Sequence, residues 1–231
     1  MNGLGDWRIN FFDLGLFTGN ETAEFLRLAD QLLEGRERPI VCVYGVDADP
    51  AYAAYCKQRF RDNPRVFVFQ FAVGSQDGKT QLYVGHTPEA HSIYRKNHCV
   101  NSGVSRIVRE VRCSTFLRDL GLLDKSPLTI NIIKANIEGA EWDLISDLDE
   151  HDLFGLFDIY LGADQWTADM LKCTDLLDRV GEAKRILVRR GVTVYPWCMG
   201  TDNYPMQAGN YDLLAAIRRY VAVGEPDLVH A

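Results

Sequence analysis

The chain has 231 residues, of which 47% are apolar and 25% are charged, and its net charge is −7 at pH 7. These proportions are those of a globular protein and exclude a disordered chain, a collagen and a coiled-coil rod. The acidic balance disfavours a nucleic-acid partner, because the overall charge gives no attraction to a phosphate backbone.

Apolar runs alternate with amphipathic segments along the chain. Continuous apolar or β-branched runs predict strands, and apolar residues at helical spacing predict helices. The expected strands are 8–14, 40–46, 66–73, 128–135, 157–161, 192–197 and 211–217. The expected helices are 22–34, 50–61, 140–148 and 169–190, with a further helix that Ser114 or Thr115 caps and that runs to residue 122. A turn at 76–78 predicts a hairpin over 71–84, and the polar segment 85–105 is expected to be irregular.

Strands that alternate with helices predict βαβ units with right-handed crossovers. We therefore expect an α/β fold with a doubly wound, mostly parallel, Rossmann-like sheet, helices on both faces and an antiparallel C-terminal strand. No linker composition interrupts the chain, so residues 1–231 are expected to form a single domain.

Three features bear on the compartment. The first residues show no basic region followed by an apolar run, so we expect no secretory signal. The most apolar stretches, such as 128–133, are too short to span a bilayer. The six cysteines contain no CxxC pair, which favours free thiols over a disulfide framework or a zinc site. We expect a cytoplasmic protein with no membrane partner and no metal, and the sequence leaves open whether it forms a homo-oligomer.

The segment after the first expected strand holds the first candidate binding residues. Ligands of a parallel α/β sheet bind beyond the carboxyl ends of its strands. Asp13 is followed there by Gly15 and Gly19, which let the backbone turn tightly before a helix N-terminus. This GxxxG spacing is not the dinucleotide fingerprint GxGxxG, and a strand-to-helix turn needs glycine with or without a ligand.

Two acids, Asp47 and Asp49, follow the second expected strand. An acid at this place can accept both ribose hydroxyls of a nucleoside. Asp49 fits equally well the N-cap of the next helix. Together, the glycine turn and Asp47 predict a cofactor that contains a nucleoside.

Polar residues also gather at the end of the expected strand 128–135 and just beyond it, namely Lys134, Asn136, Glu138 and Glu141. They would meet a substrate at the carboxyl edge of the sheet. The two glutamates are equally explained as acids that suit the positive end of a helix dipole.

Two histidines in the segment 85–105, His91 and His98, are expected to fold over the same edge of the sheet. Histidine titrates near neutrality, which suits a general base. The alternative is that both are surface histidines in a loop.

Five segments together resemble the FkbM-type family of S-adenosylmethionine-dependent methyltransferases. They are 12–22, 43–50, 71–74, 111–120 and 133–141. The family's hallmark, IK-x-D-x-EG-x-E, stands here as IKANIEGAE over 133–141. The resemblance spans about residues 8–148 and implies a class I methyltransferase with S-adenosyl-L-methionine as its cofactor.

The resemblance implies a set of cofactor-binding residues: Asp13, Gly15, Gly19, Asp47, Ala48, Phe71 and Ala72. The first three would surround the methionine part, and Asp47 would take the ribose hydroxyls. Ala48 would lie beside the adenine, which the last two would border.

This sequence departs from the family in two places. Asn136 stands where the family usually has Asp, which removes a carboxylate and with it a metal ligand. Leu16 and Phe17 stand in the glycine turn where small residues are common.

We expect an O-methyltransferase that acts on a hydroxyl of a sugar, glycan or secondary metabolite. A hydroxyl acceptor must lose its proton, so the candidate catalytic residues are Lys134, Asn136, Glu138 and His91. One alternative is a nicotinamide-dependent oxidoreductase, against which the absent GxGxxG counts. The other is a non-catalytic or differently acting Rossmann-like binding module, which Asn136 keeps open.

The acceptor is expected to be a small molecule or a glycan that binds among residues 85–105, 164–166 and 197–204. Two arginine-rich runs, 106–112 and 185–190, are usually solvated faces. Their functional alternative is to bind an anionic acceptor such as a sugar nucleotide or a phosphoglycan.

Overall fold

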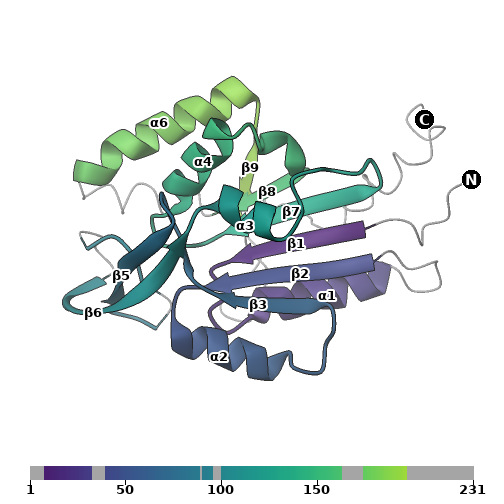
Figure 1. The fold of residues 1–231 in the computed structure, drawn as a ribbon, viewed down its shortest axis with the longest axis horizontal. Coiled ribbons are helices and arrows are strands. Elements are labelled where there is room, and N and C mark those ends of the chain that lie inside the picture. The colour runs from purple at the N-terminus through teal and green to yellow at the C-terminus, as the bar shows by residue number, and fades with distance from the viewer. Residues whose placement is uncertain (1–7, 33–39, 89, 96–99, 163–173, 197–231) are drawn as a thin grey trace, which may run out of the picture.

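Six parallel strands form the main sheet in the computed structural model (Figure 1). The structure describes residues 8–32, 40–88, 90–95, 100–162 and 174–196, and every structural statement below refers to these. In spatial order the strands are β3 (Val66–Gln70), β2 (Ile40–Asp47), β1 (Arg8–Leu14), β7 (Thr129–Ala135), β8 (Ile159–Gly162) and β9 (Val194–Pro196). The order reverses between β1 and β7, which makes the sheet doubly wound as predicted.

Helices cover both faces of this sheet. They are α1 (Asn20–Leu32), α2 (Pro50–Arg59), α3 (Cys113–Asp119), α4 (Glu141–Glu150) and α6 (Thr174–Arg190), with a 3-10 turn, η2, at Phe154–Leu156. Alternate residues of β1 point to opposite faces. Phe11 packs with Phe25 of α1 in one buried cluster, whereas Phe12 belongs to a second cluster that includes Leu148 of α4 and Ile186 of α6. The α/β fold class is therefore confirmed.

A second, smaller sheet corrects two predictions. It contains β4 (Ala72–Val73), β6 (Val100–Val111) and β5 (Gly78–Gly85), in that order. The expected strand 66–73 is divided, because the backbone leaves the main sheet at Phe71, whose N–H donates to the Asp47 carbonyl oxygen. The expected hairpin over 71–84 is wrong, because β6 lies between β4 and β5 and pairs with both.

The expectation of irregular structure through residue 105 is also wrong, because β6 begins at Val100. The sequence of β6 is polar because one face of the strand is exposed to solvent. Val108 is buried, whereas its neighbours Ile107 and Arg109 are exposed. An antiparallel sheet with one solvent-exposed face can hold polar residues on that face and still form its backbone hydrogen bonds.

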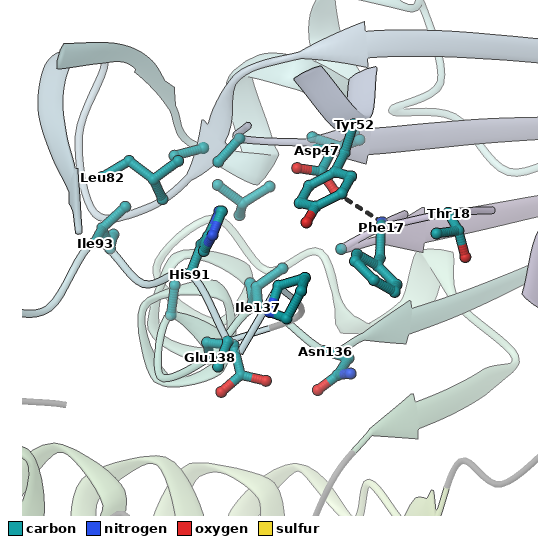
Figure 2. Close-up of a pocket in the computed structure, with 18 of the residues that line it drawn as sticks. Phe17, Thr18, Asp47, Tyr52, Leu82, His91, Ile93, Asn136, Ile137 and Glu138 are labelled. Carbon is teal, nitrogen blue, oxygen red and sulfur yellow. Dashed lines mark hydrogen bonds between the residues drawn. The ribbon is translucent and has the colours of Figure 1, made fainter. Parts of the chain in front are cut away.

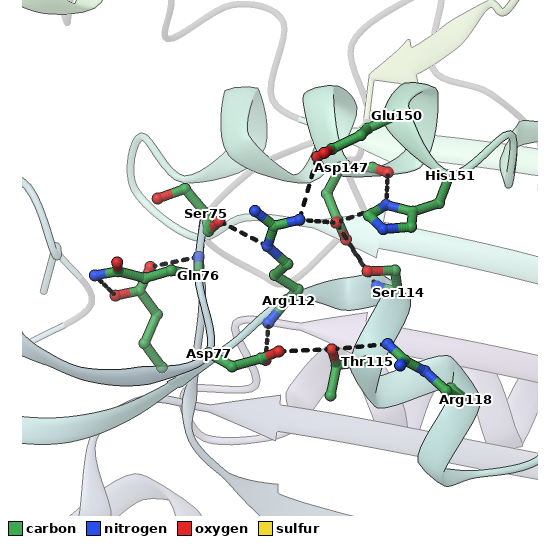
Figure 3. Close-up of polar contacts among 11 residues, drawn as sticks. Ser75, Gln76, Asp77, Arg112, Ser114, Thr115, Arg118, Asp147, Glu150 and His151 are labelled. Atoms are coloured by element: carbon green, nitrogen blue, oxygen red, sulfur yellow. Dashed lines mark hydrogen bonds and ion pairs between the residues drawn. The ribbon is translucent and has the colours of Figure 1, made fainter.

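Helix α3 begins without the side-chain cap predicted at Ser114 or Thr115. Its N-cap is Arg112, which makes no side-chain capping bond. The buried carboxylate of Asp147 in α4 instead accepts both the N–H and the hydroxyl of Ser114, at 2.7 and 2.8 Å, and Thr115 donates to Asp77 (Figure 3). A tertiary partner therefore replaces the local cap.

The arginine-rich runs are largely paired inside the fold. Arg189 and Arg190 both contact Asp149 of α4, at 2.5 and 2.6 Å, and so tie α6 to α4. Arg112 similarly contacts Glu150 at 3.2 Å. These guanidinium groups are engaged by carboxylates of the fold itself, which argues against their use as an anion site.

Several predictions lie outside the described residues: the antiparallel strand 211–217, the acceptor segments 164–166 and 197–204, and His98. None of the helices within the described ranges has the length and apolarity to cross a membrane.

Candidate active site

A cavity of about 490 Å³ opens at the carboxyl ends of β1, β2 and β7 (Figure 2). It lies where the strand order reverses, which is the usual ligand position in a doubly wound sheet. Its volume is within the range of small-molecule sites. The lining residues come from four segments, 15–21, 46–52, 71–93 and 136–140.

Most of the residues predicted from the sequence meet at this cavity. Those that line it are Gly15, Asp47, Ala48, Phe71, Ala72, His91, Asn136 and Glu138. The other three, Asp13, Gly19 and Lys134, do not line it.

Asp13 and Lys134 form a buried ion pair beneath the cavity. The Lys134 ammonium lies 2.9 Å from Asp13 Oδ1 and also donates to the Gly15 carbonyl oxygen at 2.8 Å. Thr22 donates to the other oxygen of Asp13 at 2.7 Å. Desolvation opposes the ammonium charge, but the surrounding carboxylates, Asp13 first, outweigh it and raise the pKa of Lys134. A lysine held charged and fully buried is a structural cation and cannot take a proton from a substrate.

Gly15 packs directly against the loop after β7. Its φ is +89°, and a Cβ there would lie 2.0 Å from the carbonyl oxygen of Asn136. Gly19 also has a positive φ, +73°, and a Cβ there would lie 2.7 Å from the ring of Phe60. Gly15 is therefore required where two cavity walls meet, whereas Gly19 is required where the turn packs on α2.

Asp47 lines the cavity and organises the backbone around it. Its two carboxylate oxygens accept the N–H groups of Phe17, at 2.7 Å, and Asp49, at 2.8 Å (Figure 2). Burial raises the pKa of Asp47 to about 6, although both hydrogen bonds oppose that shift. Each oxygen keeps a further lone pair with which it can accept a hydroxyl.

Asp49 is the N-cap of α2, as one interpretation of the sequence predicted. Its side chain accepts the N–H of Ala51 and lies 3.1 Å from Arg106. His91 Nδ1 lies 2.9 Å from the other carboxylate oxygen of Asp49, although the geometry is not that of a hydrogen bond. The structure thus places His91 beside the start of α2.

The loop after β7 holds Glu138 in an unusual conformation. Glu138 has φ +52°, which non-glycine residues rarely adopt. Glu141 fixes this loop, because its carboxylate accepts the N–H groups of Ile137 and Gly139, each at 2.7 Å. Ser92 donates to the Glu138 carbonyl oxygen at 2.6 Å. Backbone strain of this kind is concentrated at functional sites.

Sequence reasoning missed two aromatic residues of the cavity wall, Phe17 and Tyr52. Their rings meet edge to face, with centroids 4.7 Å apart. In the sequence Phe17 is only a bulky residue of the glycine turn, and nothing there predicts its positive φ of +47°.

The sequence also did not predict the contacts that hold the segment 90–94 against α4 and α6. The hydroxyl of Tyr94 donates to the buried carboxylate of Asp143 in α4, and Arg179 of α6 contacts both groups. Ala90, His91 and Ile93, which line the cavity, lie on this segment.

The parallel sheet, its crossover helices and the cavity at the reversal place the chain in the class of Rossmann-like α/β proteins. Residues 19–161 match the Methyltransferase FkbM domain, which is well over half of the chain. The chain therefore belongs to the FkbM methyltransferase family, as the hallmark around β7 indicated. No curated protein and no solved structure gives a significant match.

Proposed function

We propose that this methyltransferase uses S-adenosyl-L-methionine to methylate a hydroxyl of a sugar, glycan or secondary metabolite. One observation carries the proposal. In a chain of this family, a single cavity joins the Asp47 carboxylate, the glycine turn at Gly15 and the hallmark loop that bears Glu138.

The residues of the cavity fit such a cofactor. Gly15 lets the turn after β1 pack directly on the loop after β7, so that both line one cavity, and Asp47 retains acceptor capacity for ribose hydroxyls. Phe71, Leu82 and Ile93 provide an apolar surface of the kind that a purine base requires.

The chemistry divides between the cofactor and the protein. The cofactor supplies an activated methyl group when it is bound. The protein orients the acceptor and excludes water. Glu138 is the best-placed group to accept the hydroxyl proton, because it lines the cavity on a rigidly held loop and Lys134 is buried in its ion pair. Asn136 lies on the same side of the cavity as Glu138 and can form a hydrogen bond with the acceptor (Figure 2).

Thermal unfolding with and without S-adenosyl-L-methionine tests the binding step. We expect the melting temperature to rise with the cofactor and not with NADH, and Asp47→Ala to abolish the rise. Transfer of a labelled methyl group to a panel of hydroxylated acceptors tests the reaction. A protein that gains no stability at saturating cofactor contradicts the proposal.

A second candidate function is a binding module that keeps the fold without catalysis. Asn136, which replaces the family's usual Asp, favours it. Cofactor binding without methyl transfer to any acceptor of the panel would support this alternative, and labelled product would exclude it.

The proposal includes a cytoplasmic location and an acceptor that is neither a membrane nor a nucleic acid. Cys42, Cys56 and Cys113 are free thiols, which suits a reducing compartment. Desolvation raises the pKa of Cys56 to about 12, so this buried thiol stays protonated.

A further inference from the structure

The cavity wall combines aromatic rings with carboxyl groups. Glu21, Asp47 and Glu138 supply the carboxyl groups, and Phe17, Tyr52 and Phe71 supply phenyl and phenol rings. The lining residues that the structure describes include no lysine or arginine. Such a wall attracts positive charge, because both carboxylates and the faces of aromatic rings carry negative potential.

Phe17 is held in place at a cost in backbone energy. A bulky residue with a φ of +47° is a clear outlier, and glycine would adopt this conformation without strain. Two contacts maintain it: its N–H donates to Asp47 at 2.7 Å, and its carbonyl oxygen accepts the Cys56 thiol at 3.2 Å. The strain is difficult to explain by packing alone, since the ring is only half-buried on the cavity wall.

The rings of Phe17 and Tyr52 are arranged so that part of their aromatic surface stays uncovered. Their planes meet at 65°, and an edge-to-face contact covers a face of only one ring, whereas a stack covers one face of each. Figure 2 shows Phe17 and Tyr52 beside Asp47, on the side of the cavity away from Glu138. Cations within about 6 Å of such a ring are attracted by its quadrupole, most strongly where water is excluded.

We propose that Phe17 and Tyr52 make this cavity selective for a cationic sulfur, so that it binds S-adenosyl-L-methionine more tightly than S-adenosylhomocysteine. This inference rests on the proposed function. It adds that the same site distinguishes the charged donor from the neutral product. The sulfonium of the donor is positively charged, whereas the thioether of the product is neutral. A site with this preference releases product readily in exchange for fresh donor.

Calorimetric titration of the full chain with each of the two compounds measures this selectivity as a ratio of Kd values. We expect the donor to bind about tenfold more tightly than the product, which is the scale of a desolvated cation–π contact. Phe17→Leu and Tyr52→Leu keep apolar bulk without an aromatic face, so each should bring the ratio towards one. Tyr55→Leu is the matched control, because Tyr55 lies on the same helix, is 54% exposed and does not line the cavity.

Each outcome decides between the claims. Equal or tighter binding of the product by the wild type overturns the selectivity, as does a ratio that both leucine variants leave unchanged, while either result leaves the proposed function standing. Failure of both compounds to bind overturns the proposed function itself. If Phe17→Leu does not fold, Phe17→Gly removes the ring while relieving the strained φ, and the same loss of selectivity is expected.

Discussion

Lys134 and Asp13 are register partners on adjacent central strands, and their charged atoms lie 2.9 Å apart with neither side chain more than 1% exposed. The same ammonium reaches the Gly15 carbonyl oxygen at the end of β1. The pair therefore connects the body of the sheet to the turn that forms one wall of the cavity.

Removal of one member of this pair should be costly, because the other charge would stay buried without a partner. We expect Lys134→Met to lower the free energy of unfolding by about 3–5 kcal/mol, measured by urea denaturation. The double variant Asp13→Asn with Lys134→Met should recover part of that loss. Arg185→Met, which removes a largely exposed pair with Glu182, should cost no more than about 1 kcal/mol. Similar losses for Lys134→Met and Arg185→Met would contradict the structural role of the buried pair.

Gly15 should tolerate no side chain. In Gly15→Ala the Cβ would collide with the Asn136 carbonyl oxygen, which cannot move without the hallmark loop. We expect Gly15→Ala to lose cofactor binding in a calorimetric titration. Gly121→Ala is the control, because its φ of +70° is similar and nothing lies within 4 Å of the added Cβ. It should cost only about 1 kcal/mol of stability and leave binding unchanged, and equal binding by the two variants would refute this account of the turn.

Asp47 should make stability depend on pH in a definite direction. Its pKa is about 6 in the folded protein against an ordinary 3.8, so the folded state holds this proton more tightly. The stability that this provides is present below about pH 4 and is lost as the pH rises through 6. Relative to Asp47→Asn, the wild type should lose up to about 3 kcal/mol of unfolding free energy between pH 4 and 7. A stability difference between wild type and Asp47→Asn that stays constant with pH, or that changes in the opposite direction, would show that burial does not raise the pKa of this carboxyl group.

Tyr94 should control how firmly the segment 90–94 stays on the cavity. Tyr94→Phe removes the hydroxyl that donates to Asp143, so this segment should open more readily. We expect S-adenosylhomocysteine to dissociate several-fold faster in stopped-flow measurements, as the loss of about 1 kcal/mol implies. Tyr83→Phe also removes a tyrosine hydroxyl, but this one donates to the exposed Gln81 and holds no part of the cavity, so the rate should stay unchanged. If S-adenosylhomocysteine dissociates from Tyr94→Phe at the wild-type rate, Tyr94 does not control the opening of this segment.

The central strands could be predicted from the sequence because they are buried on both faces. β1, β2 and β7 are mostly apolar, and a parallel sheet brings their carboxyl ends to one edge. The placement of Gly15 and Asp47 on one cavity follows from that topology alone.

The parts that could not be predicted depend on contacts between distant residues. β6 separates β4 from β5, although the local turn at 76–78 favours a hairpin. The carboxylate of Asp147 replaces a local cap for α3. Lysine is a residue type that can serve in catalysis, so the sequence alone makes Lys134 a candidate. Its structural role becomes visible only from its ion pair with Asp13, which lies 121 residues earlier in the chain.

A structure determined with S-adenosylhomocysteine bound tests the central claim most directly. We expect the ligand in the cavity at the ends of β1, β2 and β7, with its ribose hydroxyls on the Asp47 carboxylate and its sulfur between the Phe17 and Tyr52 rings and the side that carries Asn136 and Glu138. A ligand bound elsewhere on the protein, or one whose ribose makes no contact with Asp47, would contradict the account.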